Sequence, residues 1–146
     1  MEQRETLAGR LRPAVLDREA GYALLAVLQD EATQGEALPG LEAHAPGFAD
    51  WIVTALFGGL YQREGLSPRD RQVATLAALT ALGGVEPQLT GHVRTALRVG
   101  MTPREIVEVF VHLAPYVGVP KALAGLRVAS AVLPGTGPGP AEGTEG

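Results

Sequence analysis

The sequence contains no cysteine. Without thiols, the chain can form no disulfide, zinc–thiolate site, iron–sulfur cluster or sulfur nucleophile. Its glycine pairs lack the spacing of Walker or dinucleotide loops, and the Gly-x-Ser-x-Gly elbow of serine hydrolases does not occur. Histidines, tyrosines, acids and arginines are therefore the side chains left to carry chemistry.

Long apolar runs and clustered positive charge are also missing. No stretch of about 18 apolar residues occurs, so we expect no transmembrane helix and no membrane partner. The N-terminus, MEQRETLAGRLR, has no apolar segment of signal-peptide type, which predicts a cytoplasmic location. The net charge is −4 and there is no basic stripe, so we expect no nucleic-acid partner.

The length and composition are typical of one globular domain. The chain has 146 residues, of which 46% are hydrophobic and 19% charged. We expect a single domain over residues 1–133. The last thirteen residues, 134–146, contain five glycines and three prolines, and a segment of this composition buries too little apolar area to fold. We therefore predict a disordered tail there.

Apolar residues recur at helical spacing, and strand-like alternation is nowhere sustained. This pattern predicts an all-α fold of about six helices joined by short connections. The expected helices cover residues 15–29, 46 to about 58, 68–82, 87–99, 103 to about 117 and 120–133. The third of these is apolar almost all round, which predicts a central position.

Capping residues fix several of these boundaries. Ser67 and Thr102 are each followed by proline, and an acid stands at the third helical position, which is a helix-start pattern. Gly83-Gly84 should end the third helix, and Gly100 the fourth. Pro115 should kink the fifth helix or end it early. The stretch 35–40 is expected to be a loop.

Two histidines lie on the expected helices, one on the fourth and one on the fifth. His92 is three residues from Leu89 and four from Ala96, so it flanks the stripe of the fourth helix. An imidazole there can transfer protons near neutral pH, or it can be a hydrogen-bonded structural residue. His112 shares a face with Glu108 and Tyr116, each four residues away, and this face can be either a site or a solvated polar row.

The remaining candidates are arginines and a third histidine. Arg69 or Arg71, in the first turn of the third helix, can clamp a substrate carboxylate with the guanidinium fork, or form an ion pair with another helix. His44 is expected in a surface loop before Pro46. The three histidines are far apart, and no His-x-x-x-His pair occurs, so no metal site is expected.

Two stretches together resemble the carboxymuconolactone decarboxylase family. The first is FGGLYQREGLSPRDRQVATLAAL, and the second is GHVRTALRVGMTPREIVEVFVHLAPYVGVPKALAGLRVA. The most specific pieces are Leu-x-x-His-Val-Arg-x-Ala-Leu-x-x-Gly-Met-Thr, from Leu89 to Thr102, and Tyr-Val-Gly-Val-Pro, from Tyr116 to Pro120. The resemblance covers residues 48–133, and it rests on the order and spacing of these pieces together.

The resemblance implies an alkylhydroperoxidase D-like helical fold, homo-oligomers that are commonly trimers or hexamers, and one of two chemistries. One branch uses Cys-x-x-Cys before the histidine. Since this chain has GGVEPQLTG before His92, thiol peroxidase or disulfide reductase activity is not expected. The other branch is a carboxy-lyase that decarboxylates a small lactone acid without a cofactor.

For the lyase branch, the resemblance implies His92 as the proton-transfer residue, Arg71 as a clamp for the substrate carboxylate and Tyr116 as a hydrogen-bond donor to the oxyanion. Gln72 and His112 are expected to contact substrate. Similar sequences usually have glutamate after the arginine, where this chain has Gln72. A neutral amide cannot accept a full proton at pH 7. Two alternatives therefore stay open: another small-acid enzyme on the same fold, and a non-catalytic oligomeric scaffold.

Overall fold

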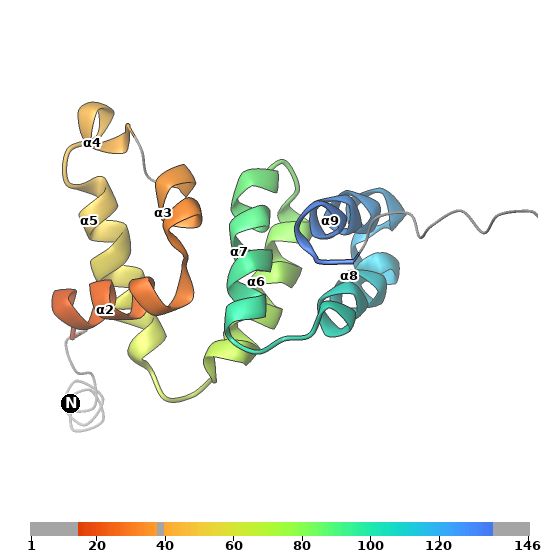
Figure 1. Cartoon of the computed structure of the whole chain (residues 1–146), viewed down its shortest axis with the longest axis horizontal. Coiled ribbons are helices and arrows are strands. Elements are labelled where there is room, and N and C mark those ends of the chain that lie inside the picture. Colours follow the sequence, from red (N-terminus) through yellow and green to blue (C-terminus); the bar gives the residue numbers. More distant parts are fainter. Residues whose placement is uncertain (1–14, 38–39, 136–146) are drawn as a thin grey trace, which may run out of the picture. The chain divides into compact units, whose positions relative to one another are not determined.

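A computed structural model of the chain describes residues 15–37 and 40–135, and this part is helical throughout (Figure 1). It contains eight α-helices, one π-helical turn and one 3₁₀ turn, and no strand occurs within the described ranges. The predicted all-α class is confirmed, with two more α-helices than the six expected. The predicted tail is described only at Pro134 and Gly135, and the rest of it lies outside the described residues.

Internal contacts group the described residues into two compact units. One unit holds residues 15–26 and 40–63, and the other holds residues 27–37 and 64–135. Helix α2 (Arg18–Leu28) contributes residues to both. The single domain expected over residues 1–133 stays a prediction.

The first unit is built from short elements, which are α4 (Leu41–His44), α5 (Phe48–Ile52), a π-helical turn (Val53–Phe57) and a 3₁₀ turn (Leu60–Gln62). The single helix expected from residue 46 is therefore wrong in its detail. Gly58 explains the end of the π-helical turn, because its carbonyl accepts the Asp17 N–H at 2.9 Å. A Cβ at Gly58 would lie 2.2 Å from the Asp17 carbonyl oxygen, so only glycine allows the two backbones to approach so closely.

Two loop predictions are also wrong. Helix α3 (Glu31–Ala37) covers the first part of the loop expected over residues 35–40, and His44 is the last residue of α4. The Asp30 carboxylate accepts the Thr33 N–H at 2.7 Å, which is the bond of a helix N-cap. Asp30 was thus a start signal for α3 that the apolar pattern alone did not reveal.

The second unit carries the long helices α6 (Pro68–Leu82), α7 (Glu86–Arg98), α8 (Pro103–Val117) and α9 (Val119–Val132). Both predicted caps are confirmed. The Ser67 hydroxyl accepts the Asp70 N–H at 3.1 Å. Thr102 and Glu105 form a reciprocal capping box, with bonds of 3.1 and 2.8 Å. Gly83 and Gly100 follow α6 and α7 at positive φ, as expected of helix-ending glycines.

Pro115 neither ends α8 early nor breaks it, because the helix continues to Val117. The proline lies in the last turn, where its missing N–H removes only the bond to the Val111 carbonyl. Gly118, at φ 94°, ends the helix instead. The early ending predicted at Pro115 is therefore wrong.

Helix α6 packs against α7, α8 and α9, which confirms its predicted central position (Figure 1). Phe110 of α8 is fully buried, and its ring lies where a Cβ of Gly125 on α9 would be, at 2.5 Å from Cδ1. Glycine at that position therefore lets α8 and α9 pack closely. The core of this unit consists of Leu76, Leu89, Val93, Ala96, Met101, Ile106, Phe110, Ala129 and Leu133.

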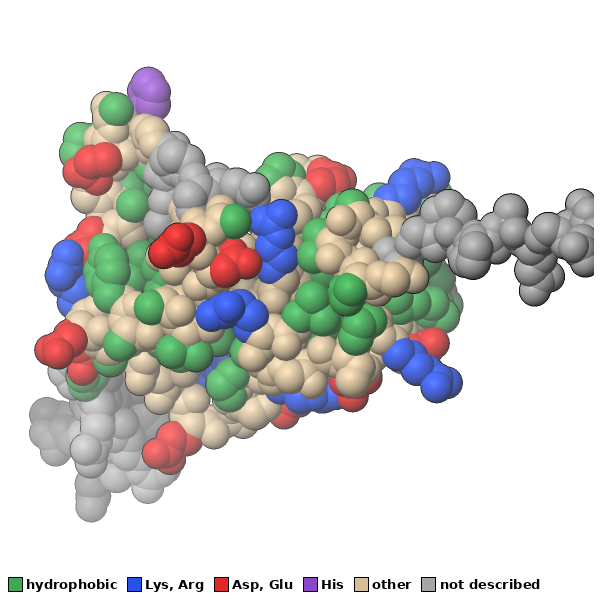
Figure 2. Space-filling model, in the orientation of Figure 1, with side chains coloured by type: hydrophobic (Ala, Val, Ile, Leu, Met, Phe, Trp, Pro, Cys, Tyr) green, Lys and Arg blue, Asp and Glu red, His purple; other side chains and the backbone are tan. Residues whose placement is uncertain are grey.

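Hydrophobic side chains also reach the surface of α8 and α9. Tyr116 of α8 is 74% exposed, and Leu123 of α9 is 43% exposed. Figure 2 shows hydrophobic surface over these two helices. Within the described ranges, no helix has both the length and the apolar character needed to cross a bilayer.

Candidate functional site

A histidine from α7 and a glutamine from α6 meet in the second unit. Gln72, Leu76 and Thr80 recur every four residues and form the buried stripe of α6. The Gln72 amide is only 1% exposed, and a buried amide needs hydrogen-bond partners. Its Oε1 lies 2.9 Å from Nδ1 of His92, which is half-buried at the edge of the α7 stripe.

This bond fixes which ring nitrogen carries a hydrogen. A glutamine Oε1 can only accept, so Nδ1 of His92 is the donor, and Nε2 is the nitrogen left to exchange a proton. Burial lowers the pKa of His92 below its usual value, because the charged imidazolium loses hydration. The pair is therefore a neutral imidazole held by a neutral amide at pH 7.

The two arginines of the first α6 turn differ in their surroundings. Arg69 donates to the Glu105 carboxylate of α8 and thus forms an interhelical ion pair. Arg71 is half-buried and precedes Gln72 directly. Adjacent helical residues point about 100° apart, so Arg71 and Gln72 lie on different parts of the α6 surface. The carboxylate-binding role of Arg71 stays a prediction.

His112 and Tyr116 lie together on α8, one turn apart. Both are exposed, and their ring centroids are 5.3 Å apart. Among the described residues, no hydrogen bond or ring contact joins either of them to His92. The structure thus brings four of the five predicted site residues together as two pairs, His92 with Gln72 and His112 with Tyr116. The fifth, Arg71, directly precedes Gln72 in the sequence.

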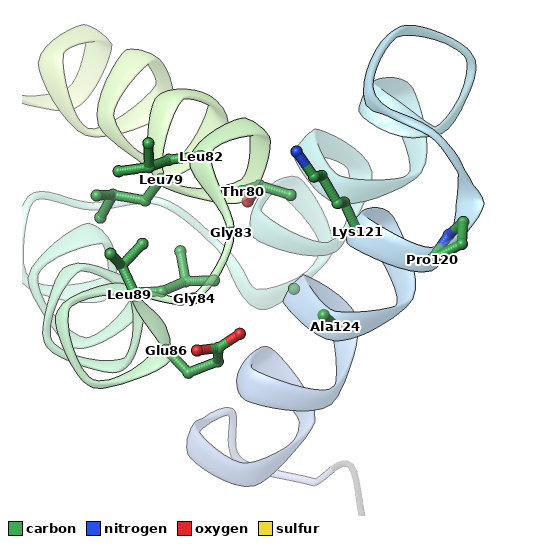
Figure 3. Close-up of a pocket in the computed structure, with 12 residues that line it drawn as sticks. Leu79, Thr80, Leu82, Gly83, Gly84, Glu86, Leu89, Pro120, Lys121 and Ala124 are labelled. Atoms are coloured by element: carbon green, nitrogen blue, oxygen red, sulfur yellow. The ribbon is translucent and has the colours of Figure 1, made fainter.

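Two cavities open on the second unit. One, of about 450 Å³, lies between α6 and α8, and apolar side chains of both helices line it together with Arg69, Arg104, Glu105, Glu108 and His112. The other, of about 410 Å³, is formed by the end of α6, the start of α7 and α9, and it contains Lys121 and Glu86 (Figure 3). His92 lines neither of them. No sequence motif points to a role for Lys121 or Glu86, although Lys121 is the sole lysine of the chain.

The described side chains form no group of three or more histidine or acidic residues placed to hold a metal ion. The chain also lacks cysteine, so no thiol can act beside His92. The groups that the structure joins here are the His92 imidazole and the Gln72 amide. Such a pair can transfer a proton and hydrogen-bond a carbonyl.

The amino-acid sequence of the chain matches one family model and is similar to known proteins. Residues 46–131 match the model of the carboxymuconolactone decarboxylase family, and this region includes both His92 and Gln72. The chain is 32% identical over 93 residues to the 4-carboxymuconolactone decarboxylase of Acinetobacter baylyi (strain ATCC 33305 / BD413 / ADP1). That match covers 64% of this chain and 69% of the Acinetobacter protein.

A second relative is an uncharacterised 15.0 kDa protein from the nqo9-nqo10 intergenic region of Paracoccus denitrificans. It is 39% identical over 77 residues, which are 52% of this chain and 58% of the Paracoccus protein. The matched part of the chain thus spans 58% of the Paracoccus protein and 69% of the Acinetobacter protein.

Proposed function

The chain belongs to the carboxymuconolactone decarboxylase family, and from this premise we propose that it is a cofactor-free carboxy-lyase that removes CO2 from a small lactone acid. One observation carries the proposal, namely the half-buried His92 imidazole bonded to the buried Gln72 amide. A ring held in this way is sheltered from bulk water and keeps one nitrogen for proton exchange.

The reaction needs no cofactor, because the conjugated lactone itself accepts electrons. The bond between the ring carbon and the carboxylate breaks, and CO2 leaves. The electron pair of that bond moves into the ring, so negative charge develops on the lactone carbonyl oxygen. The ring then takes one proton on carbon, and His92 Nε2 delivers it.

Other residues hold the reacting acid in the proposed mechanism. Arg71 binds a substrate carboxylate, and Gln72 orients His92 and contacts the substrate. Tyr116 donates to the developing oxyanion, and His112 binds substrate beside it. Because this second pair is exposed on α8, we propose that it completes the site of a neighbouring copy in a cytoplasmic homo-oligomer, a trimer or hexamer.

The lowered pKa of His92 gives the proposal a pH direction. Proton delivery requires the imidazolium, and that form is scarce at pH 7 when the pKa lies below its usual value. The decarboxylation rate should therefore rise as the pH falls through the lowered pKa. A rate that instead increases toward neutral pH would assign His92 the role of a base.

A second candidate function follows from the same neutral pair. A neutral Nε2 removes protons well at pH 7, and Gln72 supplies no negative charge to stabilise the imidazolium. This arrangement favours an isomerase that shifts a proton next to a carbonyl in a small acid. Such an enzyme would reach full activity above the lowered pKa of His92.

The decisive experiment offers the protein 4-carboxymuconolactone and a panel of related lactone acids in D2O across a range of pH. A carboxy-lyase releases CO2 and places one deuterium on the product. An isomerase exchanges hydrogen of the substrate without releasing CO2. Absence of both reactions over the whole panel would support the non-catalytic scaffold instead, and peroxide reduction by this cysteine-free chain should remain at the background rate.

A further inference from the structure

The cavity beside α9 has a chemistry that the proposed lyase does not use. It holds about 410 Å³, a size suited to a small molecule, and its walls are largely apolar. Leu79 of α6, Leu89 of α7 and Ala124 of α9 contribute to that lining (Figure 3). Two charged side chains interrupt it, and they have opposite signs.

The positive group is the ammonium of Lys121 on α9. Its Nζ donates to the Ala81 carbonyl at 2.7 Å, near the end of α6, where the helix dipole places negative charge. A lysine ammonium has three donors, so this one described bond leaves two for a ligand. The side chain passes over Gly83, where a Cβ would meet Lys121 Cε at 3.6 Å.

The negative group is the carboxylate of Glu86, at the start of α7. Figure 3 shows it entering the cavity from the wall opposite Lys121. Within the part of the chain that the structure describes, this carboxylate has no hydrogen bond and no ion pair. The two charges are thus separated by an apolar space rather than paired with each other.

We propose that this cavity binds a small zwitterion whose ammonium and carboxylate are separated by a short hydrocarbon chain, an amino acid of the ω type. The ligand carboxylate bonds Lys121, the ligand ammonium bonds Glu86, and the hydrocarbon lies against the apolar walls. A simple acid would face the Glu86 charge, and a simple amine would face the Lys121 charge. An α-amino acid with an uncharged side chain carries both charges on one carbon and cannot reach opposite walls.

Calorimetric titration of the full chain with ω-amino acids of increasing length tests the proposal. The series is 4-aminobutyrate, 6-aminohexanoate and 8-aminooctanoate, with hexanoate and hexylamine as ligands that lack one charge. We expect one length to bind best and both single-charge ligands to bind at least about tenfold more weakly, since each loses a charged hydrogen bond. Equal binding of hexanoate, or no binding at any length by folded protein, would overturn the proposal.

Two substitutions test whether Lys121 and Glu86 bind the two charged ends of the ligand. Lys121→Gln keeps a donor for the Ala81 carbonyl but removes the positive charge, and Glu86→Gln keeps the shape of the acid. Each should weaken binding of the preferred ligand by about tenfold. The matched controls are Arg127→Gln on α9 and Glu108→Gln on α8, which change charge outside this cavity and should leave affinity unaltered. Equal losses in the controls would contradict the assignment.

This site and the proposed lyase can fail separately, because they use different residues. Lys121→Gln should weaken zwitterion binding by about tenfold while CO2 release from the lactone continues at the wild-type rate. His92→Gln should have the opposite effect on the two measurements. If Lys121→Gln lost both zwitterion binding and CO2 release while its helical circular dichroism stayed unchanged, the cavity would belong to the lyase site.

Discussion

The two histidines on the long helices resemble each other in sequence and differ in structure. His92 lies on α7 and His112 on α8, and both helices are long and amphipathic. His92 is half-buried and bonds Gln72 of the neighbouring helix α6 at 2.9 Å. His112 is exposed, and its ring contacts Tyr116 of its own helix. One ring is therefore held between two helices, whereas the other lies along the surface of one.

The difference shows that the packing of a neighbouring helix over the ring determines how far a histidine is desolvated, and with it the chemistry open to the imidazole. Desolvation lowers the pKa of His92, and desolvation is supplied by the helices that pack over the ring. A partner one turn along the same helix supplies a ring contact but leaves solvent access. We therefore expect chemistry to depend on His92, and ligand contact on His112.

The largest expected effect is on turnover. Substituting His92 by Gln should lower the rate of decarboxylation by about 10² to 10⁴-fold, because a positioned proton donor is lost. The same substitution at His112 removes at most one hydrogen bond to substrate. It should raise KM by no more than about tenfold and leave kcat unchanged. Steady-state kinetics of the two variants, measured side by side, makes the comparison.

Circular dichroism should show the same helical content in both variants, since neither substitution removes an apolar core residue. If His112→Gln lowered kcat as much as His92→Gln, the contrast between an inner and an outer histidine would be lost. His112 would then take part in the chemical step and not only bind the substrate.

Adjacent residues of α8 test the same contrast in stability. Phe110 is fully buried against Gly125, whereas Val111 is 48% exposed. Phe110→Ala should lower the free energy of unfolding by about 3–5 kcal/mol, through lost burial and the cavity that remains. Val111→Ala should change it by less than about 0.5 kcal/mol. Urea unfolding of both variants measures the difference, and similar losses would indicate that Val111 is covered in an oligomer.

Helix positions in the second unit could be predicted largely because their ends are encoded locally. Ser67 and Thr102 cap the helices that they were expected to cap, and Gly83 and Gly100 follow helix ends. The first unit lacked such signals. Its π-helical turn depends on the approach of Asp17 to Gly58, a contact between segments about forty residues apart, and no local pattern reveals it.

The position of His92 could be predicted from the sequence, but the arrangement around it could not. The spacing of Leu89, His92 and Ala96 placed the imidazole beside a buried stripe, and the structure has it half-buried there. The bond to Gln72 joins residues twenty positions apart, and it depends on how α6 and α7 pack. For the same reason, the cavity with Lys121 and Glu86 was not foreseen.

Removing the residue that contacts each histidine should lower the free energy of unfolding moderately for the His92 pair and very little for the His112 pair. Gln72→Leu fills the same space but leaves Nδ1–H of the half-buried His92 without its acceptor, which should cost about 1–3 kcal/mol of unfolding free energy. Tyr116→Leu removes an exposed ring and should cost less than about 0.5 kcal/mol. Thermal and urea unfolding report both values. A larger loss for Tyr116→Leu would mean that this side chain is buried by another copy.

The smallest expected effect is a change in the pKa of His92. Gln72→Glu keeps the geometry of the α6–α7 pair and adds a carboxylate next to His92 Nδ1. A negative charge at hydrogen-bond distance stabilises the imidazolium, so the pKa of His92 should rise by about one unit or more, against the lowering that burial causes. Each unit corresponds to about 1.4 kcal/mol between the two protonation states.

NMR titration of the His92 ring measures the shift in its pKa. Glu108→Gln is the control, because that charge lies on α8 and should leave the His92 titration unchanged. If proton delivery limits the lyase, the pH range in which it is active should move upward with the ring, toward neutrality. An unmoved His92 titration in Gln72→Glu would mean that the amide does not control the proton on this ring.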